Sequence, residues 1–366
     1  VNGSLEVYWN TTKDLLMAVP VDNTTGYSYQ FQNFGKTSNR GIELSVNVDV
    51  INKGDFRFNV GAIYNYNRNK LDELPNADQY LYSSYWGSSS LVPTNDYMFV
   101  EGKAIGLVRG FISEGYYTVD DFNYTNGQYV LKEGVPDITK ALTATYMHPY
   151  DLPAGQTAFP GAAKFRDVDE SGTVDLDDAT CLGEVMPRHT GSFQLNFNYK
   201  NFDLSTNFNW TAGGKVYNVA AMINASGQEF DGIGAQRASW VADAFKVYNV
   251  NAAGDLYAVT NPDELRALNA NAKYHLPYHQ SGITSSEWLE NGSYLRLQTL
   301  TLGYTLPKNW LTKVHVDKIR LYLTATNLFT ITGYSGIDPE VNANPTGQSG
   351  FYSDLRIFPT LNMDFG

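Results

Sequence analysis

The residues best placed to do chemistry lie in one acidic segment, residues 167–178, which reads DVDESGTVDLDD. Its oxygen-bearing groups have the spacing of a calcium-binding loop, whose ligands come from positions 1, 3, 5, 7, 9 and 12. Gly172 falls at position 6, where such a loop turns sharply, and Val174 at the apolar position 8. A hard cation needs several oxygens that converge from one segment. The predicted calcium ligands are Asp167, Asp169, Ser171, Thr173 through its carbonyl, Asp175 and Asp178.

An acidic surface loop held by Asx turns is the alternative interpretation of this segment. Asp178 is shorter than the usual glutamate at position 12, so it reaches a cation in bidentate fashion less readily. Outside a cell, a weak site with a Kd of about 10⁻⁴ to 10⁻³ M would still fill. We therefore expect a structural Ca²⁺ ion in an extracellular loop.

No group of residues in the sequence predicts catalysis, and we expect that the protein is not an enzyme. His275 and His279 have the spacing of metal ligands on a helix, but Pro277 between them would break that helix. The single Cys181 excludes an intramolecular disulfide. Loop aromatics could stack on sugars or contact a peptide, although packing within the loops is the commoner explanation. They are Tyr80, Tyr82, Tyr85, Trp86, Trp240 and Trp288.

The elements that must position this loop are β-strands. In residues 191–210, GSFQLNFNYKNFDLSTNFNW, apolar and polar side chains alternate on both sides of a short turn at Lys200 and Asn201. A period of two predicts two strands of a hairpin. Residues 42–50 and 56–66 repeat the pattern around the turn NKGD, and residues 99–117 form a weaker third candidate because of their glycines.

This alternation fits either a soluble sandwich or a membrane barrel. The polar positions are mostly Asn, Gln, Ser and Asp, whereas the apolar face is rich in aromatic side chains. A membrane barrel turns its apolar face to lipid and small polar groups to a wet lumen. No apolar run is long enough for a membrane helix, so any span must be a strand.

The connections between the predicted strands alternate in length, which favours the barrel. Short ones lie at 51–55, 200–202 and 306–318, whereas long ones lie at 11–38, 68–98, 118–190, 212–292 and 330–352. Outer-membrane barrels have short periplasmic turns and long extracellular loops. The later strands are expected at 294–305, 319–332 and 355–365. We count about ten strands, an even number that returns the chain to the periplasm.

The charge of the chain bears on its partners, and its first residues bear on whether it is part of a longer polypeptide. The chain has 26 Lys and Arg against 38 Asp and Glu, a formal net charge of −12, and no basic stripe. This balance speaks against nucleic acid as a partner. The sequence starts at Val1, already in a strand-like pattern, and we expect it to be a C-terminal piece of a longer polypeptide.

Six stretches spread along nearly the whole chain carry a family resemblance. They are NFGKTSNRGIEL (33–44), VEGKAIG (100–106), FRDVDESGTVDLDD (165–178) before GEVMPRHTGSF, GSYLRLQTLTLGYTLP (292–307), NLFTITGYSGIDPE (327–340) and the closing strand. In this order they resemble the SusC/RagA-like TonB-dependent transporters of the Bacteroidota outer membrane. One departure is Gly366 after Phe365, where the family usually ends on the aromatic residue.

The resemblance implies an all-β transmembrane antiparallel barrel of about 22 strands, with a plug and a TonB box. Residues 1–366 would then be the C-terminal part of that barrel, without the plug and the TonB box, and segments 118–190 and 212–292 would be extracellular loops. It also implies import of oligosaccharides, or of peptides as a second class, with a SusD-like surface lipoprotein as lid and TonB as energy source. The residues that bind the ligand are not indicated. Two other classes stay open: a calcium-dependent surface adhesin or glycan-binding β module, and a passive porin.

Overall fold

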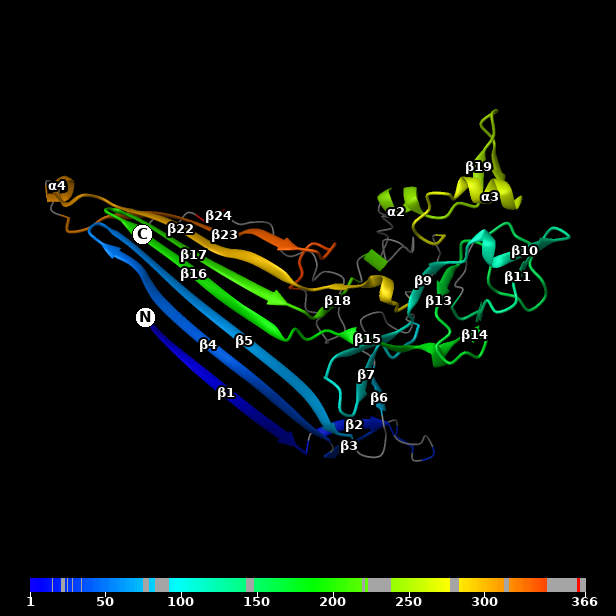
Figure 1. The fold of residues 1–366 in the computed structure, drawn as a ribbon, viewed down its shortest axis with the longest axis horizontal. Coiled ribbons are helices and arrows are strands. Elements are labelled where there is room, and N and C mark those ends of the chain that lie inside the picture. Colours follow the sequence, from blue (N-terminus) through cyan, green and yellow to red (C-terminus); the bar gives the residue numbers. More distant parts are fainter. Residues whose placement is uncertain are drawn as a thin grey trace.

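The computed structural model has a long sheet at one end and a lobe built from loops at the other (Figure 1). It describes residues 1–14, 16–20, 24, 26–27, 29–33, 35–74, 79–82, 92–142, 148–218, 221–222, 238–276, 283–312, 316–340 and 361–362.

The long sheet is antiparallel, and over the described residues its strand order is β1-β4-β5-β16-β17-β22-β23-β24. Each strand therefore pairs with the one that follows it along the sheet, which is the meander expected of an outer-membrane barrel wall. The strands are β1 (Asn2–Lys13), β4 (Lys36–Lys53), β5 (Phe56–Glu73), β16 (His189–Tyr199), β17 (Phe202–Ala212), β22 (Tyr294–Thr305), β23 (Arg320–Thr332) and β24 (Leu361–Asn362).

Aromatic side chains face one another across neighbouring strands on the apolar face. The rings of Phe193 and Phe208 stack with centroids 4.5 Å apart, and those of Phe58 and Phe197 with centroids 4.3 Å apart. Cross-strand pairs of this kind stabilise a sheet and fix its register. Yet this face is open to the surroundings: Leu5 and Val7 of β1 are 67% and 71% exposed. The strands are thus held in register without burying their apolar side chains in a core.

Amide and hydroxyl side chains form a hydrogen-bonded row across the opposite face. The Asn59 amide donates to Asn47 Oδ1 over 2.6 Å, and the Asn196 amide donates to Asn59 Oδ1 over 3.5 Å. Ser205 Oγ donates to Asn196 Oδ1 over 2.6 Å. This row runs from β4 through β5 and β16 to β17. A neutral polar surface of this kind suits a water-filled lumen.

Short turns join the strands at the end of the sheet away from the lobe (Figure 1). Gly54 and Lys200 adopt left-handed conformations there, with φ of 58° and 53°, as tight hairpin turns require. The third short connection contains the helix α4 (Lys308–Leu311). The described parts of the long connections leave from the opposite end (Figure 1). The predicted long connections 68–98 and 118–190 belong to one connection between β5 and β16, because residues 99–117 do not return to the long sheet.

The lobe contains short elements from the long connections. No helix among the described residues is long and apolar enough to cross a membrane. Its strands and helices are β2 (Leu16–Pro20), β3 (Tyr29–Asn33), β6 (Gln79–Tyr82), β7 (Tyr97–Val100), β8 (Leu107–Gly110), β9 (Ser113–Tyr116), η3 (Val119–Asp121), β10 (Phe122–Thr125), β11 (Gln128–Leu131), β12 (Asp137–Ile138), β13 (Ala163–Phe165), β14 (Thr173–Val174), η4 (Leu176–Asp178), β15 (Thr180–Glu184), β18 (Lys215–Tyr217), α2 (Ala238–Asp243), β19 (Tyr248–Val250), β20 (Leu256–Ala258), α3 (Pro262–Leu268), η5 (Ser286–Trp288) and β21 (Leu289–Asn291).

A buried core unites the two longest connections in this lobe. Phe111 and Tyr117 from the first connection are fully buried in one cluster with Val259 and Leu265 from the second. Hydrogen bonds also cross between the connections: Tyr129 Oη donates to the Thr260 carbonyl over 2.9 Å. The two loops therefore fold as one unit.

The sequence prediction of a third hairpin at residues 99–117 is confirmed only in part. β7 and β8 pair antiparallel around a turn at residues 101–106, but this hairpin is not part of the long sheet. β7 and β8 lie instead in a smaller sheet of order β15-β8-β7-β6, and β9 pairs with β13. Leu107 and Val108 are adjacent and both buried, so this stretch packs on two sides and does not present one face to lipid. The long sheet has eight described strands, fewer than the ten expected. Of the expected last strand, 355–365, only β24 falls within the described residues, and it pairs with β23.

Candidate metal centre

The acidic segment 167–178 forms a compact loop in the lobe between β13 and β15. Gly172 has a φ of 87°, a conformation that a residue with a side chain rarely adopts. Its N–H donates to Asp167 Oδ2 over 2.7 Å, and the Ser171 N–H donates to Asp167 Oδ1 over 3.1 Å. The turn thus wraps the chain around the first carboxylate, and the sharp bend predicted at Gly172 is present.

Asp178 closes the loop from its far end. Its carboxylate is fully buried and accepts hydrogen bonds from the Val168, Asp169 and Asp175 N–H groups, at 2.5, 3.3 and 2.8 Å. It also caps the helix η4 together with Asp175. Position 12 is therefore folded back against positions 2 and 3.

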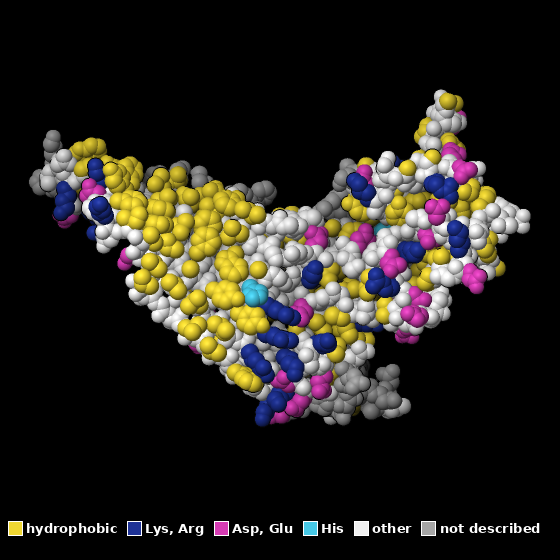
Figure 2. Space-filling model, viewed as in Figure 1, with side chains coloured by type: hydrophobic (Ala, Val, Ile, Leu, Met, Phe, Trp, Pro, Cys, Tyr) yellow, Lys and Arg dark blue, Asp and Glu magenta, His cyan; other side chains and the backbone are white. Residues whose placement is uncertain are grey.

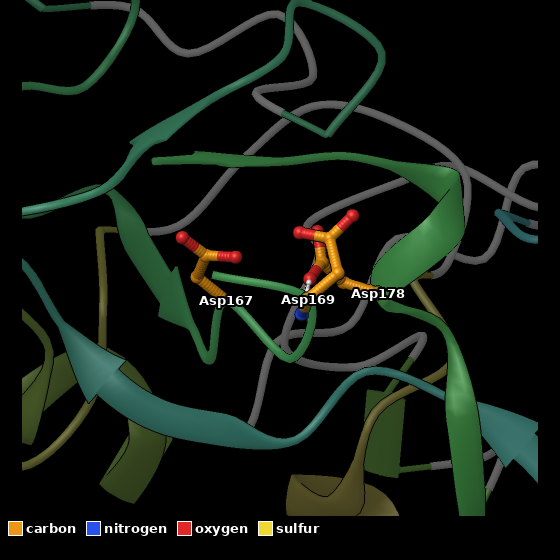
Figure 3. Close-up of side chains that lie close together, drawn as sticks. All are labelled: Asp167, Asp169 and Asp178. Carbon is orange, nitrogen blue, oxygen red and sulfur yellow. Dashed lines mark hydrogen bonds between the residues drawn. The ribbon is translucent and has the colours of Figure 1, made fainter. Parts of the chain in front are cut away.

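Asp167, Asp169 and Asp178 bring one carboxylate oxygen each to within 4.8 Å of one another. The three side chains project to the same side of the loop (Figure 3). Hydrogen bonds from Ser171 lower the pKa of Asp169, which keeps that carboxylate ionised. Three neighbouring negative charges, one of them buried, repel each other, and an all-oxygen group of this kind suits a hard cation.

The other three predicted ligands lie in the same loop but have different partners. Ser171 Oγ donates to the Thr173 carbonyl over 3.0 Å, so these two oxygens face each other. Asp175 Oδ1 accepts from the Asp177 N–H over 2.8 Å and caps η4. Asp175 lies outside the group of three carboxylates, although position 9 often acts through a water molecule.

Contacts from distant residues hold this loop in place, and sequence reasoning missed them. Val174 at position 8 is fully buried, and β14 pairs in parallel with β12. The Arg109 guanidinium donates to the Leu176 carbonyl over 3.0 Å, and burial lowers the pKa of Arg109. Asp137 next to β14 accepts from the Ala158 N–H over 2.7 Å. No local spacing signals these partners, because they are brought together only by folding of the lobe.

A second group that the sequence did not indicate joins the sheet to the segment after β23. The Arg296 guanidinium of β22 contacts both Asp338 and Glu340, at 2.5 Å each, and Arg296 and Asp338 are buried. Tyr294 Oη donates to Glu340 over 2.7 Å. The only sequence signal was that both segments lie in stretches that carry the family resemblance. Fixed ion pairs at this position tie a long connection to the end of the barrel wall.

Other candidate residues have structural partners. His275 is buried, its Nδ1 lies 2.8 Å from the Leu276 carbonyl and its Nε2 lies 3.7 Å from Glu287. Trp240 and Trp288 pack in one buried cluster, which supports the packing explanation for these aromatics. Tyr82 is 45% exposed. Pro277, His279, Tyr85 and Trp86 lie outside the described residues, as does the side chain of Tyr80.

The chain is similar over nearly its whole length to known receptors. It is 29% identical over 373 residues to the TonB-dependent receptor P3 of Formosa agariphila, a match that covers 99% of this chain and 32% of the receptor. It is 25% identical over 359 residues to the TonB-dependent receptor SusC of Bacteroides thetaiotaomicron, covering 94% of this chain and 29% of SusC. No protein-family model matches the chain.

The fold agrees with these similarities. The structure of the RagAB peptide transporter superposes with a TM-score of 0.61 and 23% identity, over 92% of this chain and 31% of that one. This chain spans about a third of the length of the proteins that it matches. Those relatives are receptors and transporters, not enzymes. The chain is thus similar over nearly its whole length to a segment of SusC/RagA-like TonB-dependent receptors, and its long sheet has the fold of part of an outer-membrane β-barrel wall.

Proposed function

We propose that the whole protein to which this chain belongs is an active nutrient importer driven by TonB. The observation that carries the proposal is the two-faced sheet, open and apolar on one side and lined with amides on the other, in a chain that matches TonB-dependent receptors along 99% of its length. In this proposal the sheet supplies barrel wall, and the lobe, with segments 118–190 and 212–292, faces outside the cell. The described residues supply no catalytic step.

Oligosaccharides are the substrate class that we propose first. The inner face of β16 and β17 carries mostly neutral hydrogen-bonding groups, including Gln194, Asn196, Ser205 and Asn209. Such groups can exchange hydrogen bonds with the hydroxyls of an uncharged solute as it passes, without holding it by charge. Peptides are the second candidate, because the similar RagAB structure is that of a peptide transporter.

The proposed partners are a SusD-like surface lipoprotein at the lobe and TonB at the opposite side of the membrane. The lobe has its own buried core, so it can offer a rigid docking surface to a lid. TonB would act through parts of the receptor other than this chain. No nucleic acid partner is proposed, because the chain carries a net charge of −12.

Uptake by cells that express the whole receptor tests this function. We expect uptake of labelled oligosaccharide to require both the receptor and TonB, and a labelled peptide mixture tested in parallel decides between the two substrate classes. Uptake that persists without TonB would establish a passive porin instead. Recovery of the protein as a soluble, detergent-free monomer would favour the adhesin or glycan-binding module.

We further propose that the loop 167–178 binds a structural Ca²⁺ ion through Asp167, Asp169 and Asp178, with Ser171, Thr173 and Asp175 completing the oxygen set. The clustering of three carboxylate oxygens within 4.8 Å supports this. Asp167→Ala combined with Asp169→Ala should abolish bound calcium, measured by elemental analysis of the purified receptor. Asp263→Ala, an exposed acidic residue on α3, is the matched control. Equal calcium content in all three proteins would refute the site.

A further inference from the structure

The outward face of the first three strands of the sheet changes from apolar to basic at one common level. Trp9 of β1 lies directly opposite Arg40 of β4, and Arg40 lies directly opposite Arg68 of β5. One step further down the same face, Ile42 lies opposite Tyr66. In Figure 2, Lys and Arg side chains gather between the hydrophobic band over the long strands and the lobe. We call Trp9, Arg40 and Arg68 the basic rim.

The basic rim lies at the level where lipid headgroups would be. On β5 the apolar face runs from Phe56 to Tyr66, which is about 33 Å at about 3.3 Å per residue. A strand tilt of about 40° reduces this to the height of about 25 Å that the apolar band of a barrel has. Tyr66 and His189, whose rings lie 5.1 Å apart, stand just below the rim as interfacial aromatics do. Arg40 and Arg68 therefore lie immediately above the hydrocarbon.

Two arginines directly opposite each other on neighbouring strands repel, and such pairs destabilise a sheet. The nearby lysines already have acidic partners: Lys36 pairs with Glu73 at 3.0 Å and Lys70 with Asp72 at 3.3 Å. Within the described part of the chain, neither Arg40 nor Arg68 forms an ion pair with an acidic side chain. An external anion between the two guanidinium groups would remove the repulsion.

Arg40 is also oriented for such an anion. Its guanidinium carbon lies 3.7 Å from the ring centroid of Trp9, in a cation–π contact. This contact occupies the flat face of the guanidinium and leaves its N–H edges for hydrogen bonds. Both Arg40 and Arg68 are exposed. The planar fork of arginine matches two oxygens of a phosphate group.

We propose that Arg40 and Arg68 together bind the phosphate of a lipid headgroup in the outer leaflet. The charge of the rim and its continuity with the lipid-facing band favour a lipid as the occupant. The inference rests on the proposed function, because it requires that the lobe end of the sheet faces outside the cell. The bound lipid would fix the height and the annulus of this barrel segment in the membrane.

The test uses the purified whole receptor after removal of bound lipid, in a neutral detergent. Lipid A that carries its phosphates is titrated in phosphatidylcholine nanodiscs, and dephosphorylated lipid A serves as the second probe. The test variant is Arg40→Gln with Arg68→Gln. The matched control is Lys53→Gln with Arg57→Gln, which removes the same charge from the same hairpin beside its short turn. Retained lipid is quantified by native mass spectrometry.

We expect the affinity for phosphorylated lipid A to fall at least about tenfold in the test variant, since it loses two charge-assisted contacts, and to stay unchanged in the control. Equal binding of dephosphorylated lipid A, or equal loss in both variants, would overturn the proposal. Inorganic phosphate that competes fully at millimolar concentration would show a site for a free anion, not for a lipid. These readouts on purified protein are independent of uptake, so a failed import assay and a failed lipid site are told apart.

Discussion

The long sheet exposes its large apolar side chains, whereas the lobe buries them. In the sheet, large apolar residues such as Leu5 and Val7 are mostly exposed, whereas in the lobe Phe111 and Tyr117 are fully buried. A soluble domain buries its apolar side chains, and a membrane barrel exposes them to lipid. The lobe therefore packs like a soluble domain and the sheet like a membrane barrel, because water surrounds the lobe and lipid contacts the sheet.

Polar groups also differ between the two regions, because they are buried in the lobe and open to water in the sheet. In the lobe, the buried Tyr117 hydroxyl has one fixed partner: Tyr117 Oη donates to the Pro136 carbonyl over 2.7 Å, and burial raises the pKa of Tyr117. In the sheet, amides such as Asn59 and Asn196 form an open row that water can join. A polar group in the lobe thus supports the fold, whereas in the sheet it lines a surface.

The largest effect is expected in the core of the lobe. Phe111→Ala should lower the free energy of unfolding of the lobe by about 3 to 5 kcal/mol, because it leaves a cavity against Phe165. Hydrogen exchange measured by mass spectrometry should show faster exchange in the lobe and unchanged exchange in β16 and β17. Equal acceleration in both regions would show that the lobe has no stability of its own.

A charge on the lipid-facing side of the sheet should have the next largest effect. Leu195→Arg should cost about 2 to 4 kcal/mol, since Leu195 lies midway along the apolar face of β16. Gln194→Arg on the polar face is the control and should change stability by less than about 0.5 kcal/mol. Denaturant unfolding in lipid vesicles measures both variants. Similar losses in the two would contradict the assignment of faces.

Calcium withdrawal should affect the lobe and spare the sheet. At about a hundred times its Kd, bound calcium would stabilise the lobe by about 2.7 kcal/mol, and a chelator should remove this contribution. Limited proteolysis at increasing temperature measures the thermal unfolding of the lobe. In wild type, the chelator should shift this unfolding to lower temperature. The Asp167→Ala, Asp169→Ala variant should show no shift, and a shift equal to that of wild type would point to a different site.

The smallest effect concerns Glu287 of η5, near the junction of the two regions. Burial raises the pKa of Glu287, against an opposing contribution from His275. Because the folded state holds this proton more tightly than the unfolded chain, the group stabilises the lobe at low pH, and the contribution is lost as the pH rises through the folded pKa. Glu287→Gln should match the stability of wild type at about pH 4 and exceed it at about pH 7, because glutamine has no charge to bury. Parallel stability curves from pH 4 to 7 would contradict this.

Local pattern was enough to predict the strands of the sheet. The alternation in residues 191–210 predicted the hairpin of β16 and β17, and the strand expected at 294–305 has the bounds of β22. Sequence spacing also predicted the turn at Gly172, and three of the six predicted ligands, Asp167, Asp169 and Asp178, lie together. Each of these features depends on residues that lie close together in the sequence, so a two-residue period or a motif spacing is enough to predict it.

Only the tertiary structure decided how the long connections fold. β12 has two residues, and its partner β14 lies far along the chain, so neither has a recognisable period. The apolar residues of 99–117 suggested barrel strands. In the structure the adjacent residues Leu107 and Val108 are both buried, and a sequence pattern does not record which partners cover the second face. The sequence by itself determined the two faces of the sheet, since β geometry alternates side chains without regard to what surrounds them. The core of the lobe and the ion pairs of Arg296 required the folded chain, because their partners meet only through contacts that are distant in sequence.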